Sequence, residues 1–89
     1  MTIAELQKLI AGRYEAADRA RGTPKTFLWF IEEVGELATA LNGDDLANVR
    51  EEFADVLAWL CTLANINDVN LTTAIEEKYC RKGASEQPK

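Results

Sequence analysis

The sequence predicts an all-α protein, a four-helix bundle of short amphipathic helices. Apolar residues recur at three- to four-residue spacing in several windows, which is the spacing of one face of an α-helix. No window alternates apolar and polar residues over a useful length, so no β-strand is expected. Gly22 and Gly43 fall between the helical windows, where they mark turns.

The first two helices are bounded by recognisable start and stop signals. Thr2 followed by Glu5 predicts a capping box, and a helix then extends to about residue 20 with apolar residues at helical spacing (Ile3, Leu6, Leu9, Ile10 and Tyr14). Arg21-Gly22 ends it. Thr23 is expected as the N-cap of the second helix, with Pro24 at its first helical position. That helix should end near Leu41, before Asn42-Gly43.

The second half of the chain predicts two more helices. Asp44 or Asp45 caps a third helix that continues to about Ala64. Residues 65–70 form a turn-rich connection, in which Asn65 is expected as a C-cap. Asn70 caps a short fourth helix that ends near Tyr79. Each amphipathic helix must bury its apolar stripe against the others, so we expect one domain over residues 1–80 and a flexible tail over residues 81–89.

Composition excludes several functional classes. The net charge of −5 argues against a nucleic-acid polymer as the partner, because phosphate backbones bind basic surfaces. No run approaches the roughly 18–20 apolar residues that span a bilayer, and no basic-then-apolar leader is apparent, so a cytoplasmic protein is expected. There is no histidine, which leaves zinc without a plausible ligand set. A chain of 89 residues has a small core, and a homodimer or homotetramer is expected.

Two windows of the predicted second and third helices resemble each other. Residues 30–37 and 49–56 both have the pattern apolar-x-acid-acid-apolar-small-acid-apolar, with an offset of 19 residues. Positions i and i+3 share one face of a helix. The pattern therefore places Glu33 with Glu36, and Glu52 with Asp55, at the same helical phase beside the apolar stripe.

These four carboxylates are candidate metal ligands. If the two helices form an antiparallel hairpin, the carboxylates converge, and like charges in one site repel unless a cation neutralises them. An all-oxygen ligand set suits Mg²⁺ or Mn²⁺, and Mg²⁺ commonly bridges to substrate phosphates. The alternative interpretation is that the acids are ordinary residues of solvated helix faces.

The paired motifs also resemble a known family. Glu32-Glu33-Val34-Gly35-Glu36-Leu37, followed by the window from Glu51 to Leu57, is similar to the MazG-like all-α nucleotide pyrophosphohydrolases, whose signature is EExxE, a spacer, then ExxD. Here 15 residues separate Glu36 from Glu52. The resemblance covers about residues 24–80. It implies an oligomeric bundle that cleaves a nucleoside triphosphate to a nucleoside monophosphate and pyrophosphate.

The resemblance also implies roles for individual residues. Glu33, Glu36, Glu52 and Asp55 match the family's magnesium ligands, and Glu32 matches an extra leading glutamate that positions or deprotonates the attacking water. These five acids are the candidate catalytic residues.

Three further residues are candidate substrate contacts. Lys78 matches a lysine often found in the last helix of such proteins, and Arg81 follows one turn later; both side chains also suit a helix C-terminus. Trp29 lies beside the carboxylates and either stacks on a base or packs in the core or an interface.

Three other functions are weighed against this one. A non-catalytic oligomeric interaction protein with acidic faces would show no Mg²⁺ dependence. A di-iron bundle typically uses Glu-x-x-His motifs, which a chain without histidine lacks. A regulatory member of the family would keep the fold without the activity. House-cleaning of damaged nucleotides and control of nucleotide pools both fit the predicted enzyme.

Overall fold

The computed structural model describes residues 1–81, which form four α-helices and no strand. The helices are α1 (Ile3–Arg21), α2 (Thr23–Leu41), α3 (Leu46–Ile66) and α4 (Leu71–Tyr79). The predicted all-α class and the four predicted helices are confirmed. The predicted tail lies, from residue 82 onward, outside the described residues.

Helix α1 begins at the predicted capping box, in which the Thr2 hydroxyl accepts from the Glu5 backbone N–H and Glu5 accepts from the Thr2 backbone N–H. A single residue, Gly22, separates α1 from α2. Its φ of 82° lies in the region that favours glycine. The prediction that Thr23 is the N-cap of α2 is wrong, because Gly22 occupies the cap position and Thr23 is the first helical residue. A glycine supplies the sharp change of chain direction that a threonine would strain to adopt.

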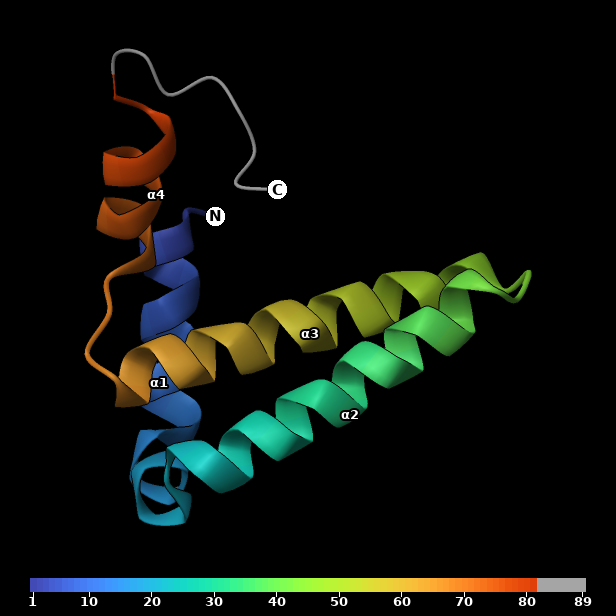
Figure 1. The fold of residues 1–89 in the computed structure, drawn as a ribbon, viewed down its shortest axis with the longest axis horizontal. Coiled ribbons are helices and arrows are strands. Elements are labelled where there is room, and N and C mark those ends of the chain that lie inside the picture. The colour runs from blue at the N-terminus through green and yellow to red at the C-terminus, as the bar shows by residue number, and fades with distance from the viewer. Residues whose placement is uncertain (82–89) are drawn as a thin grey trace.

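Helices α2 and α3 form an antiparallel hairpin. Asn42 ends α2 as predicted, and the Asp45 side chain caps α3 by accepting from the Asn48 N–H. Figure 1 shows the two helices side by side near their connection, and α1 crossing their other ends. This arrangement brings the two acidic windows onto neighbouring helices.

A polar network joins α1 to the end of α3 and the start of α4. Gln7 and Asn65 exchange two hydrogen bonds of 3.1 Å, through the Gln7 side-chain amide and the Gln7 carbonyl. Gln7 also donates to the Val69 carbonyl and accepts from the Leu71 N–H. The prediction that Asn65 is a C-cap is wrong, since Asn67 caps α3 and Asn65 binds α1 instead. Asn70 caps α4 as predicted.

The described part of the chain buries little apolar surface. Its buried apolar residues are Ile10, Ala40, Cys61 and Ala64, whereas many large apolar side chains of α2 and α3 remain exposed, including Phe27, Leu28, Ile31, Phe53, Leu57 and Leu60. The radius of gyration is 14.6 Å, against about 12 Å for a compact domain of this length. The monomer is therefore open. No helix among residues 1–81 has the length and apolar character needed to cross a membrane.

Candidate metal centre

The two acidic windows meet across the α2–α3 hairpin. Carboxylate oxygens of Glu33 and Glu36 on α2 and of Glu52 on α3 all lie within 4.8 Å of one another. The repeated motif accounts for this arrangement, because it sets the acids at the same phase on two antiparallel helices. We call Glu33, Glu36 and Glu52 the carboxylate cluster.

The environment of the carboxylate cluster disfavours negative charge. Glu33 and Glu52 are half-buried, whereas Glu36 is exposed. Burial raises the pKa of both Glu33 and Glu52, and the neighbouring charges of Glu36 and Asp55 raise it further. Within residues 1–81, one buried oxygen of each of these two side chains, Oε2, has no hydrogen-bond partner. Such orphaned acceptors are uncommon in folded proteins and call for a ligand or an ordered water.

The donor set fits a hard divalent cation. All the available ligand atoms are carboxylate oxygens, which suit Mg²⁺ and Mn²⁺ rather than zinc or copper. A cation at this position would give the two orphaned oxygens a partner and would offset the repulsion among the acids. The residues present therefore fit the metal that the sequence predicts.

Asp55 and Glu32 border the carboxylate cluster without joining it. Asp55 lies close enough to raise the pKa of Glu33 and Glu52, but its oxygens are outside the 4.8 Å set. Glu32 is exposed and lines an open groove of about 560 Å³, whose lining residues are Glu32, Gly35, Glu36, Thr39, Asn48 and Glu52.

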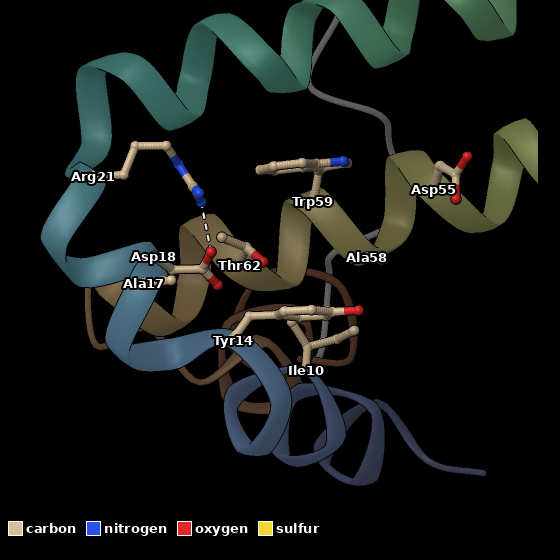
Figure 2. Close-up of a pocket in the computed structure, with 9 residues that line it drawn as sticks. All are labelled: Ile10, Tyr14, Ala17, Asp18, Arg21, Asp55, Ala58, Trp59 and Thr62. Atoms are coloured by element: carbon tan, nitrogen blue, oxygen red, sulfur yellow. Dashed lines mark hydrogen bonds and ion pairs between the residues drawn. The ribbon is translucent and has the colours of Figure 1, made fainter.

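A second hollow, which we call the aromatic cavity, includes Asp55 in its lining. It has a volume of about 370 Å³ and is lined by residues of α1 and α3, namely Ile10, Tyr14, Ala17, Asp18, Arg21, Asp55, Ala58, Trp59 and Thr62. Figure 2 shows the rings of Tyr14 and Trp59 facing this space, with Asp55 farther along α3. A volume of this order suits a small organic ligand.

One wall of the aromatic cavity is an ion pair at the end of α1. The Arg21 guanidinium donates to Asp18 at 2.5 Å and to the Thr26 hydroxyl at 2.9 Å. The guanidinium carbon lies 4.6 Å from the ring centroid of Trp29 and 5.2 Å from that of Trp59. The two indoles meet edge to face at 5.7 Å. Sequence reasoning missed the ion pair, although the i, i+3 spacing of Asp18 and Arg21 was a usable signal.

The three candidate substrate contacts lie in two different parts of the fold, Trp29 on α2 and the other two in and just after α4. Trp29 lies one helical turn before Glu33 on α2 and does not line the aromatic cavity. Arg21 and Lys25 both lie against its ring, the Lys25 Nζ at 5.4 Å from the centroid. Lys78 is in the last turn of α4, which packs against α1, and Arg81 follows the helix. Within the described residues, no hydrogen bond or ion pair joins them to the carboxylate cluster, and the Lys78 ammonium lies 5.7 Å from the Tyr79 ring.

Comparison with protein-family models places the chain in a family. No curated protein matches the chain. A family model described as the MazG nucleotide pyrophosphohydrolase domain matches residues 22–89, a range that includes α2, α3, α4 and every acid of the two windows. Members of this family generally depend on a divalent metal ion. With most of its length matched, the chain belongs to the MazG nucleotide pyrophosphohydrolase family.

Proposed function

We propose that this protein uses Mg²⁺, or Mn²⁺, to hydrolyse a nucleoside triphosphate to a nucleoside monophosphate and pyrophosphate. The observation that carries the proposal is the carboxylate cluster, whose oxygens lie within 4.8 Å of one another and include two buried acceptors without partners in residues 1–81. Family membership supplies the class of reaction. Glu33, Glu36, Glu52 and Asp55 are the proposed metal ligands.

In the proposed chemistry the acids divide into metal ligands and a proton acceptor. A bound divalent cation supplies positive charge to the phosphate oxygens and lowers the pKa of water. Glu33 and Glu52, held half-buried on facing helices, fix the position of that charge between them. Glu32, exposed at the neighbouring groove, accepts a proton from the attacking water. A cation held by these acids would reverse the local potential of the site and so allow an anionic substrate to bind.

The two hollows beside the carboxylates suggest how the nucleotide lies. The aromatic cavity offers ring faces and apolar surface from Tyr14, Trp59 and Ile10, which suits a base and sugar. The groove on the other side offers the polar side chains of Thr39 and Asn48, which can donate to phosphate. We therefore place the nucleoside in the aromatic cavity and the leaving pyrophosphate along the groove. Trp29 then acts on the substrate through its contact with Trp59.

A homodimer or homotetramer completes the proposal. The exposed apolar residues of the α2–α3 hairpin and the open shape of the monomer favour burial against a second copy. Lys78 and Arg81, in and just after α4, which packs on α1, would bind phosphate at the site of a second copy. Light scattering at micromolar concentration should return at least twice the 9.9 kDa of one chain; a monomer would contradict this part. We propose that the protein acts in the cytoplasm.

A nucleotide panel tests the proposed reaction. Canonical and base-modified nucleoside triphosphates are incubated with Mg²⁺, and phosphate products are resolved by anion exchange. We expect monophosphate and pyrophosphate in equal amounts, and none when Mg²⁺ is chelated. Glu77→Gln on α4, which removes an exposed acid away from the windows, is the matched control and should keep activity. Orthophosphate as the only phosphate product would contradict the proposal. Absence of turnover on the whole panel would also contradict it and would favour the non-catalytic interaction protein.

A further inference from the structure

The two tryptophans of the chain span the hairpin directly beside the carboxylate cluster. Trp29 lies four residues before Glu33 on α2, and Trp59 lies four residues after Asp55 on α3. Four residues are about one helical turn. The edge-to-face contact of the two indoles, 5.7 Å between centroids, therefore joins α2 to α3 about one turn from Glu33 and about two turns from Glu52.

Arg21 is held against both indoles by groups from two helices. Its guanidinium binds Asp18 on α1 and Thr26 on α2, and the exposed side-chain fractions are 13% for Arg21 and 7% for Asp18. Thr26 is fully buried. A cation over an aromatic face is worth more when it is desolvated, and a guanidinium fixed by hydrogen bonds keeps one orientation. Arg21 thus ties α1, α2 and α3 together at a single point.

The carboxylate cluster opposes this contact, because its charges repel one another across the hairpin. Glu33 and Glu36 on α2 face Glu52 on α3, and like charges at this distance push the two helices apart. Few apolar side chains are buried in the hairpin to resist that force. Mg²⁺ demands nearly ideal octahedral geometry with ligands at about 2.0–2.1 Å, so a small change in helix separation matters for metal binding.

We propose that Arg21, oriented by Asp18 and Thr26, is a positioning residue that sets the separation of α2 and α3 at the carboxylate cluster through the Trp29–Trp59 pair. This inference rests on the proposed metal site. Asp18 and Arg21 precede residues 22–89, so the family match does not include them. A purely structural ion pair would stabilise the fold without affecting the metal affinity of the folded protein.

Metal affinity without nucleotide tests the proposal, because it removes any contact between Arg21 and substrate. The probe is Mn²⁺ alone, with the free ion counted by its paramagnetic resonance signal. The main variant is Asp18→Asn/Arg21→Met, since removing Arg21 alone leaves a buried carboxylate unpaired. The matched control is Arg19→Met, which removes a guanidinium from the same helix that pairs instead with Glu15 and Asp68.

The double variant should bind Mn²⁺ about tenfold more weakly or worse, as is typical when residues that support metal ligands are replaced. Arg19→Met should bind as the parent does. A second readout is tryptophan emission, which reports only Trp29 and Trp59 because the chain has two tryptophans. Adding Mg²⁺ should change the emission of the parent, and this response should be lost in the double variant.

Arg21→Lys provides the conservative variant. It keeps a positive charge beside Asp18 but lacks the planar group that contacts both indoles, so its Mn²⁺ affinity should fall between those of the parent and the double variant. A folded double variant that binds Mn²⁺ with the affinity of the parent would overturn the inference. If the double variant does not unfold cooperatively, an Arg21→Lys variant with the parent's Mn²⁺ affinity would overturn it instead. Failure of the parent to bind Mn²⁺ would instead overturn the metal site itself, and the inference with it.

Discussion

Two polar regions of this fold differ in how completely their hydrogen bonds are made. At the junction of α1, α3 and α4, the Gln7 and Asn65 side chains bind each other and the backbone on both sides. In the carboxylate cluster, the buried Oε2 atoms of Glu33 and Glu52 lack partners among residues 1–81, and the nearest charges are negative. Satisfied polar groups hold a fold together. Unsatisfied acids of one sign lower the stability of the metal-free protein, so we assign them to ligand binding.

The largest expected effect is on catalytic activity, which should depend on the acids of the two windows and not on the junction of α1, α3 and α4. Glu33→Gln, Glu52→Gln and Asp55→Asn each keep side-chain size but remove a proposed anionic ligand, so the rate of pyrophosphate release should fall by orders of magnitude. Gln7→Ala, at the junction, should leave kcat unchanged at temperatures where the protein stays folded. Full activity in Asp55→Asn would break the comparison, because that residue would then be an ordinary surface acid.

The next largest effect is on stability, and here we expect the substitution at the junction to matter. Asn65→Ala removes both hydrogen bonds between Asn65 and Gln7, which should lower the free energy of unfolding by about 2 kcal/mol. Mn²⁺ affinity of the folded variant should not change. Urea unfolding with a fixed slope measures the loss. A variant as stable as the parent would show that the junction contributes little to the fold.

A smaller effect appears in the pH dependence of stability. The raised pKa of Glu52 means that the folded state binds its proton more tightly than the unfolded state. This contribution is fully present below the ordinary glutamate pKa of about 4.3 and is lost as pH rises through the raised value. Without metal, the parent should therefore lose stability relative to Glu52→Gln between acidic and neutral pH. Parallel stability curves for the two proteins in chelator would contradict the assigned electrostatics.

The smallest effect concerns α4. Lys78→Ala should raise KM several-fold and leave kcat nearly unchanged, since a phosphate contact present in both the ground and the transition state is uniform binding. Steady-state kinetics on the best substrate of the panel measures both constants. An unchanged KM would show that Lys78 only serves the end of its helix, where its ammonium lies near Tyr79.

Local sequence signals predicted the elements well because their physical causes are local. The Thr2–Glu5 capping box and the Asp45 and Asn70 caps depend on residues three positions apart, and the helical phase of the acids follows from 3.6 residues per turn. The prediction of the N-cap of α2 failed because Gly22 is both the C-cap of α1 and the N-cap of α2. The sequence of either helix taken alone does not predict a shared cap.

Contacts between helices could not be predicted from these signals. Helical phase places Asp55 on the same face as Glu52, but only the relative offset of α2 and α3 decides that Glu52 joins Glu33 and Glu36 while Asp55 borders the aromatic cavity. Likewise, Asn65 binds Gln7, 58 residues away, and Arg21 reaches Trp59 only because α1 crosses the hairpin.

The most direct test of the central claim is the melting temperature of the metal-free parent and of Glu33→Gln, each with and without millimolar Mg²⁺. A ligand that binds only the folded state stabilises it by mass action. We predict that Mg²⁺ raises the melting temperature of the parent, that Glu33→Gln without metal melts above the metal-free parent because repulsion is relieved, and that it gains much less from Mg²⁺. A parent whose melting temperature is indifferent to Mg²⁺ would contradict the assignment of the carboxylate cluster as a metal site.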